Sequence, residues 1–188
     1  MIRFLTPQLR VETVLELGPD RLRAMGLDAL LLDVDGTLKR YRRQRPAPAV
    51  AAWIESLRTA GFKLCLLSNG RGRRIGQFAR QVEIPAVCRA CKPLPYGCRR
   101  AMRMLGAAAN RTAIIGDQVF ADVMAGRLAG VFTILVRPIH PEEEPWFTRL
   151  KRPLESRFLR WLAQREAGGA QKSIFLRSPF GVRHWTFR

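Results

Sequence analysis

The chain has 188 residues, the length of one domain with short appendages, and no second catalytic domain is expected. Its formal net charge is +18, so we expect an anionic partner such as a phosphate-bearing ligand, a nucleic acid or an anionic lipid surface. The sequence at 1–20 lacks the unbroken apolar core of a secretory signal, and no apolar run reaches the length of a transmembrane helix, so we expect a cytoplasmic protein whose contact with a membrane is at most peripheral.

Helix and strand patterns alternate along the chain from Pro19 onward. A Pro and a Gly bound the first helix, and later helices carry apolar residues at helical spacing. The strands are near-continuous apolar runs, which is typical of parallel strands covered on both faces. In chain order the expected elements are helix 19–26, strand 29–34, helix 46–61, strand 62–67, helix 75–82, strand 84–88, helix 96–105, strand 112–115, helix 118–130 and strand 131–136.

This alternation predicts an α/β protein with a doubly wound parallel sheet. Residues 1–165 are expected to form the domain and residues 166–188 a C-terminal tail that contains Phe175, Phe180, Trp185 and Phe187. The end of the domain has aromatic and apolar residues at helical spacing with arginines between them: Trp146, Phe147, Leu150, Leu154, Phe158 and Trp161, with Arg149, Arg152, Arg157 and Arg160. A helix packed on the sheet and an interfacial helix lying on an anionic bilayer both fit this pattern.

The apolar run at 30–32 stops at two aspartates, Asp33 and Asp35, which are followed by Gly36. Side chains at i and i+2 of an extended segment share a face, so both carboxylates can point toward one reacting group or one divalent cation. An Asx-turn that caps a strand uses the same residue types, and this short motif fits both readings. Because doubly wound sheets bind ligands beyond the carboxyl ends of their strands, residues that follow other strands are expected to join this pair: Ser68, Asn69, Asp117 and Asp122.

The chain resembles the haloacid dehalogenase superfamily of phosphotransferases in four ordered motifs: DVDGT at 33–37, Ser68-Asn69, Lys92 within CKP, and GDQVFAD at 116–122. Within that superfamily it is similar to the small YqeG-type phosphatases of subfamily IIIA, whose relatives include phosphatidylglycerophosphate phosphatases of mitochondria and plastids. The similarity runs from about Phe4 to about Leu162 and includes SNG followed by an Arg-rich helix start. It departs at Gly36, where YqeG-type chains usually carry Asn.

The resemblance implies a Mg²⁺-dependent phosphatase of Rossmann-like fold that works through an aspartyl-phosphate. Asp33 would be the nucleophile and Asp35 the general acid and base. Lys92 would supply a fixed positive charge where negative charge gathers. Phosphoryl oxygens would be bound by Thr37, Ser68 and Asn69. The Mg²⁺ would be held by Asp33, the Asp35 carbonyl and Asp117, with Asp122 as a ligand or as support.

The segment between Asp35 and Ser68 is too short for the cap domain that superfamily members often insert there. We therefore expect an open site, which suits a bulky or surface-borne phosphate such as the headgroup of phosphatidylglycerophosphate; a partner subunit of a homo-oligomer could still cover it. Nucleotide and sugar phosphates stay open as alternatives. A rim of basic residues is expected around the site: Lys39, Arg40, Arg42, Arg43, Arg45, Arg71, Arg73 and Arg74.

The charge also fits an accessory protein that keeps the fold and binds RNA or ribosomes, although aromatic residues are not interleaved with the basic loop as on a base-stacking surface. Cys65 and Arg71 have the spacing of cysteine phosphatases, but Cys65 lies in an apolar strand and is expected to be buried. The remaining cysteines, Cys88, Cys91 and Cys98, lack the fourth ligand of a structural zinc site. We expect His140 and His184 to be solvent-exposed.

Overall fold

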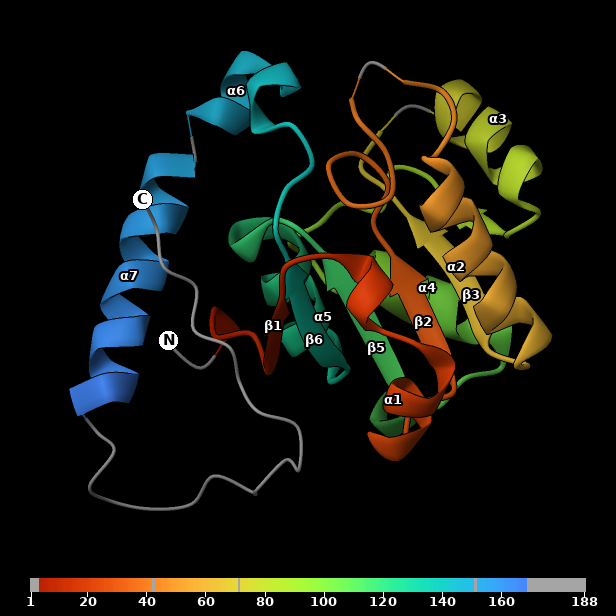
Figure 1. Cartoon of the computed structure of the whole chain (residues 1–188), viewed down its shortest axis with the longest axis horizontal. Coiled ribbons are helices and arrows are strands. Elements are labelled where there is room, and N and C mark those ends of the chain that lie inside the picture. The colour runs from red at the N-terminus through yellow and green to blue at the C-terminus, as the bar shows by residue number, and fades with distance from the viewer. Residues whose placement is uncertain (1–3, 42, 71, 151, 169–188) are drawn as a thin grey trace. The chain divides into compact units, whose positions relative to one another are not determined.

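The computed structural model describes residues 4–41, 43–70, 72–150 and 152–168 (Figure 1). The chain divides into two compact units, Met1–Glu144 and Pro145–Arg188. This division falls before the expected domain end at residue 165, and that boundary stays a prediction. The aromatic residues expected in the tail, and His184, lie outside the described residues.

The first unit is built on a six-stranded parallel sheet with the order β1-β6-β5-β2-β3-β4. Leu30 of β2 is in register with Leu64 of β3 and with Ala113 of β5. The predicted doubly wound α/β fold is confirmed. The strands are β1 (Leu9–Val11), β2 (Ala29–Leu32), β3 (Lys63–Leu67), β4 (Ala86–Val87), β5 (Thr112–Gly116) and β6 (Phe132–Val136).

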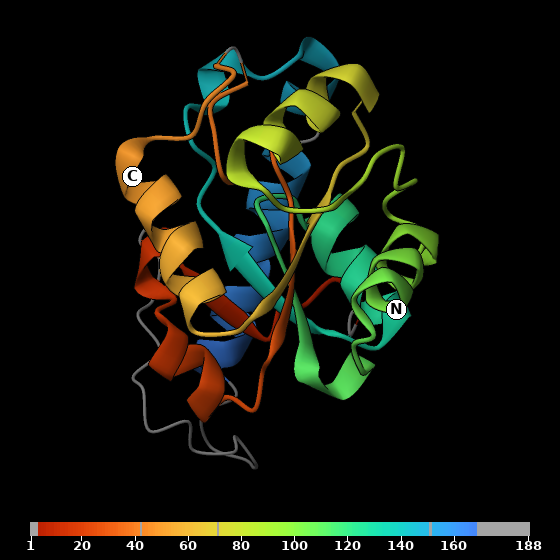
Figure 2. The same cartoon turned by 90° about the vertical axis from the view of Figure 1, so that its right-hand side faces the viewer.

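Helices cover both faces of the sheet (Figure 2). Leu30 and Leu32 pack in the core that contains residues of α1, α2 and α3, whereas Leu31 packs in the core of α4 and α5. Because successive strand side chains point to opposite faces, a strand between two helical layers must be apolar throughout, which explains the continuous run. The α-helices of this unit are α1 (Pro19–Ala24), α2 (Pro48–Thr59), α3 (Gly72–Val82), α4 (Tyr96–Leu105) and α5 (Met124–Ala129).

Two features of the first unit lack a sequence signal. The edge strand β1 has three residues and pairs with β6, and so short a segment shows no periodicity. A π-helical turn, η4 (Val119–Val123), precedes α5 where a regular helix was expected, and such turns recur at functional sites. The short 3₁₀ turns are η2 (Val14–Glu16), η3 (Ala109–Arg111) and η5 (Pro141–Glu143).

The second unit contains α6 (Trp146–Arg149) and α7 (Arg152–Gly168). Trp146, Leu150 and Leu154 are exposed by 76%, 70% and 63%, so apolar surface here faces solvent. Basic residues accompany it, and the Arg165 guanidinium lies 4.7 Å from the centre of the Trp161 ring. Of the helices the structure describes, none combines the length and the hydropathy needed to cross a membrane.

Candidate active site

The carboxyl ends of three neighbouring strands bring the candidate residues together. β2 lies between β3 and β5, and strand order reverses there, because β3 and β4 extend one side of the sheet before β5 returns to the other. Asp33 follows β2, Ser68 follows β3 and Asp117 follows β5. The backbone amide of Asp33 still donates to the carbonyl of Ile115 at 2.9 Å, so pairing continues into the site. This switch point is where doubly wound sheets bind ligands.

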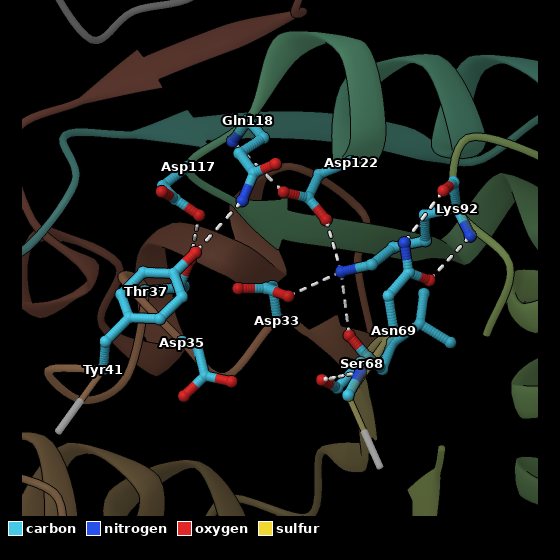
Figure 3. A network of polar contacts seen from close by, with 12 residues as sticks. Asp33, Asp35, Thr37, Tyr41, Ser68, Asn69, Lys92, Asp117, Gln118 and Asp122 are labelled. Atoms are coloured by element: carbon cyan, nitrogen blue, oxygen red, sulfur yellow. Dashed lines mark hydrogen bonds and ion pairs between the residues drawn. The ribbon is translucent and has the colours of Figure 1, made fainter. Parts of the chain in front are cut away.

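A buried lysine occupies the centre of the site (Figure 3). The Lys92 Nζ donates to Asp33 Oδ1 at 2.5 Å, to Asp122 Oδ1 at 2.7 Å and to the carbonyl of Leu67 at 3.0 Å. All three donor positions of the ammonium group are therefore used, as a buried charge requires. Lys92 thus links the ends of β2 and β3 to the turn that follows β5.

The charges of this cluster perturb one another. Burial raises the pKa of Asp33, the Lys92 ammonium lowers it and Asp122 raises it again, with a net pKa of about 6. Burial lowers the pKa of Lys92, but the two carboxylates outweigh burial and raise the pKa above its ordinary value, so Lys92 stays charged. Burial also raises the pKa of Asp122. The cluster therefore holds more carboxylates than Lys92 neutralises, which favours a further cation.

The donor set fits a divalent metal ion. One oxygen from each of Asp33, Asp117 and Asp122 lies within 4.8 Å of the other two. The second oxygen of Asp33, Oδ2, is buried and has no hydrogen-bond partner among the described residues. Hard cations such as Mg²⁺ prefer carboxylate oxygens. The predicted metal contact of the Asp35 carbonyl stays a prediction.

Two glycines allow these carboxylates to approach the backbone. A Cβ on Gly116 would lie 2.2 Å from Asp122 Cγ, a distance that no side chain tolerates. A Cβ on Gly36 would lie 2.8 Å from Asp117 Oδ2, and Gly36 has a φ of +88°, a conformation that favours glycine. The turn after β2 and the end of β5 are thus shaped around the metal-binding candidates.

The Asp35 side chain does not join this cluster but is held by two cations. Lys39 Nζ donates to Asp35 Oδ1 at 2.5 Å, and Arg74 of α3 donates to Oδ1 at 2.7 Å and to Oδ2 at 2.5 Å. Lys39 is only 3% exposed. The tight turn folds the Lys39 side chain back over Asp35, so its charge lies within the site. The predicted ring of basic residues around the site stays a prediction.

The three predicted phosphate-binding residues have different partners. The Thr37 hydroxyl donates to Asp117 Oδ1 at 3.2 Å, and the Ser68 hydroxyl accepts from the backbone amide of Gly70 at 3.0 Å. The Asn69 side chain bonds the backbone of Lys92 with both its amide and its carbonyl, each at 2.8 Å. Their contacts with phosphate stay predictions, and the structure gives Asn69 a second task, which is to hold the Lys92 segment.

Tyr41 is a site residue that the sequence reasoning missed. Its hydroxyl accepts from Gln118 Nε2 at 3.4 Å, and its ring lies beside Thr37 and Asp117 (Figure 3). Burial, followed by the negative charge of Asp117, raises its pKa above the ordinary value. The basic loop does contain this one aromatic residue, which the expectation of a loop without interleaved aromatic residues overlooks. Asp33, Asp35 and Lys92 are each at most 8% exposed, so the side chains at the centre of the site are buried. Access of a bulky substrate to this centre stays a prediction.

Comparison with known proteins decides the family. Residues 7–130 match the family described as "Hydrolase: haloacid dehalogenase-like hydrolase". The chain belongs to the haloacid dehalogenase-like hydrolases. The predicted resemblance is confirmed, and with it the prediction of an enzyme of the phosphatase type.

Relatives of this hydrolase include a Bacillus subtilis (strain 168) protein described as "Probable phosphatase YqeG", which is 30% identical over 84% of the chain and 91% of that protein. "Phosphatidylglycerophosphate phosphatase 1, chloroplastic/mitochondrial" from Arabidopsis thaliana is 23% identical over 85% of the chain, which spans about half, 49%, of that protein. The structure of the cobalt-bound deoxy-D-mannose-octulosonate 8-phosphate phosphatase from Haemophilus influenzae has a TM-score of 0.51 at 18% identity, covering 61% of this chain and 70% of that one. That likeness shows the fold.

The basic rim of the hydrolase is only partly seen. Arg43, Arg45 and Arg73 are exposed, while Arg42 and Arg71 lie outside the described residues. Arg40 is ion-paired with Glu143 at 2.8 Å.

Two residues of the alternative sites have the predicted exposure. Cys65 is fully buried and His140 is exposed.

Proposed function

We propose that this phosphatase is Mg²⁺-dependent, forms an aspartyl-phosphate on Asp33 and acts on a phospholipid headgroup phosphate such as that of phosphatidylglycerophosphate. The observation that carries the catalytic part is the buried Asp33 carboxylate, which has one oxygen held by Lys92 and the other without a hydrogen-bond partner in the described structure. An oxygen held in place and a second oxygen free of donors are what a nucleophile beside a metal ion needs.

The first half-reaction forms a bond between an Asp33 oxygen and phosphorus and breaks the bond between phosphorus and the leaving oxygen. Lys92 stabilises the negative charge that gathers on the phosphoryl group. Asp35 takes up a proton from solvent before this step and gives it to the leaving oxygen. A bound Mg²⁺, held by Asp33, Asp117 and Asp122, would supply Lewis-acid stabilisation of phosphoryl charge.

The second half-reaction returns Asp33 to its starting state. Asp35, now ionised, takes a proton from a water molecule, and the resulting oxygen attacks phosphorus. The bond between phosphorus and the Asp33 oxygen breaks, so inorganic phosphate leaves. Ser68 and Thr37, both buried beside the carboxylates, bind the phosphoryl oxygens through these steps.

Three observations support a lipid-borne substrate. The Arabidopsis relative is described as a phosphatidylglycerophosphate phosphatase. The connection from Asp35 to Ser68 consists, in its described residues, of a loop, α2 and β3. This connection has no room for a cap domain that would keep a large substrate from the site. The second unit exposes Leu150 and Leu154 beside arginines, a combination that suits an anionic lipid surface.

The test is phosphate release from phosphatidylglycerophosphate in mixed micelles with Mg²⁺. We expect turnover by the wild type, loss of turnover after chelation, and at least about 10³-fold slower turnover by Asp33→Asn, because a covalent route is removed. An Asp33→Asn variant as active as the wild type would contradict the mechanism. Turnover of soluble esters with none of the lipid would contradict the substrate.

The net charge of +18 supports one other candidate, a protein of this fold that binds RNA or ribosomes. Its test is salt-dependent RNA binding by the Asp33→Asn variant together with no turnover of any phosphoester by the wild type. The complete set of catalytic groups favours the enzyme.

A further inference from the structure

The two cations that hold Asp35 differ in their freedom to move. Lys39 lies four residues after Asp35 in the same turn, and its side chain is 1% exposed. Arg74 comes from α3, and its side chain is 45% exposed. Lys39 is also held by the carbonyl of Arg40 at 3.3 Å. Asp35 therefore has one permanent cation and one that can leave toward solvent.

Arg74 also lies beside the group that is to bind the phosphoryl oxygens. A Cβ placed on Gly70 would be 3.1 Å from Ser68 Oγ and 3.2 Å from Arg74 Nη2, so the guanidinium and the hydroxyl border the same small space. Asp35 meets the leaving oxygen and Ser68 meets the transferred phosphoryl group. A cation next to both lies alongside the path of the leaving group.

We propose that Arg74 is a specificity residue that exchanges its ion pair with Asp35 for an ion pair with a second oxyanion, a phosphodiester or a carboxylate, in the leaving group of the substrate. This inference rests on the proposed function, because it takes Asp35 as the group that meets the leaving oxygen. The exchange frees Asp35 from a bidentate contact. Lys39 stays in place, so Asp35 is never a buried charge without a partner.

The geometry of Arg74 suits this role. A guanidinium presents paired N–H donors that match a phosphate or carboxylate, and it already makes such a two-point contact with Asp35. The preferred substrate is thus a phosphomonoester whose leaving group carries another oxyanion a few bonds from the ester oxygen. The headgroup of phosphatidylglycerophosphate has this chemistry, and glycerol 3-phosphate does not.

Two matched pairs of soluble esters test the proposal. Deacylated phosphatidylglycerophosphate is compared with glycerol 3-phosphate for the phosphodiester, and 3-phosphoglycerate with glycerol 3-phosphate for the carboxylate. For the wild type we expect a higher kcat/KM on the ester with the second anion. In Arg74→Gln the ratio of kcat/KM values, anionic over neutral, should fall by about 10-fold or more, the size expected for one lost charge-assisted contact.

Two further variants complete the design. Arg74→Lys keeps the charge but not the paired donors, so its ratio should lie between those of the wild type and Arg74→Gln. Arg80→Gln removes the same charge from an exposed position of α3 and should keep the wild-type ratio. Equal losses on anionic and neutral esters in Arg74→Gln would overturn this inference alone. A wild type that hydrolyses the lipid in mixed micelles but has equal kcat/KM on both members of each pair would likewise overturn this inference alone. A wild type that releases phosphate with Mg²⁺ neither from the lipid nor from any of these esters would overturn the proposed function and this inference with it.

Discussion

The side chain of Asn69 is bonded to the backbone of Lys92 on both sides: Lys92 N donates to Asn69 Oδ1 and Asn69 Nδ2 donates to the Lys92 carbonyl, each at 2.8 Å. Lys92 lies in the loop before α4 and not at the end of a strand of the sheet. The contact with Asn69 therefore fixes a catalytic candidate whose position the sheet does not determine.

Replacing Asn69 with Ala should lower kcat by about 10- to 100-fold with a smaller change in KM, because Lys92 loses its fixed position beside Asp33. The free energy of unfolding should fall by about 1–3 kcal/mol for the two lost hydrogen bonds. Steady-state kinetics on a soluble phosphomonoester and urea unfolding measure the two effects. Asn69→Asp keeps the acceptor but not the donor, so it should be intermediate. A raised KM with wild-type kcat would instead indicate that Asn69 binds phosphate.

The stability of the metal-free protein should depend on pH through Asp33. Its pKa in the folded protein is about 6, above the ordinary 3.8, so folding favours the protonated form. This contribution to stability is present below pH 3.8 and is lost as pH rises through about 6. Asp33→Asn lacks the titration, so relative to the wild type it should gain about 1–2 kcal/mol between about pH 5 and about pH 7.5. Urea unfolding in a chelator measures this, and parallel pH profiles of the two proteins would rule it out.

Gly116→Ala should weaken metal binding and stability together, because the added Cβ would overlap Asp122. We expect a loss of at least about 2 kcal/mol in the free energy of unfolding, as for other overpacked sites. The Mg²⁺ concentration for half-maximal activity should rise. Gly18→Ala is the control for the metal dependence, since nothing lies within 4 Å of a Cβ there and it should leave the half-maximal Mg²⁺ concentration unchanged. Wild-type metal dependence in Gly116→Ala would contradict the placement of Asp122 in the metal site.

A double variant, Leu150→Ser with Leu154→Ser, should bind vesicles that contain phosphatidylglycerol at least about 10-fold more weakly, because each leucine contributes roughly 1.5–3 kcal/mol when fully buried in an apolar phase. Sedimentation with anionic and with zwitterionic vesicles measures the loss. The control is Leu94→Ser, which alters a leucine of the first unit that is 49% exposed. Undiminished vesicle binding would show that these leucines do not contact lipid.

The sequence predicted the parts of the site that depend on the sheet. Asp33, Ser68 and Asp117 each follow an apolar strand, and parallel strands bring their carboxyl ends to one edge whatever the loops do. The pairing of Lys39 and Arg74 with Asp35 was not predicted, because it depends on the course of a turn and on a helix start, which leave no periodic pattern. The basic run at 39–45 was predicted to surround the site, and its composition does not indicate which member is buried against Asp35.

The loop that carries Thr37 and Tyr41 is held by residues about 100 positions later in the chain, in the segment after β6. Ile139 N donates to the Gly36 carbonyl at 2.8 Å, and Arg40 pairs with Glu143 at 2.8 Å. The partly exposed ion pair adds little stability, but the backbone hydrogen bond fixes the position of Gly36 relative to Ile139. The segment after β6 thus holds the loop of Thr37 and Tyr41 in its conformation. A graft of this loop into another hydrolase would keep its geometry only if residues 137–144 were transplanted with it.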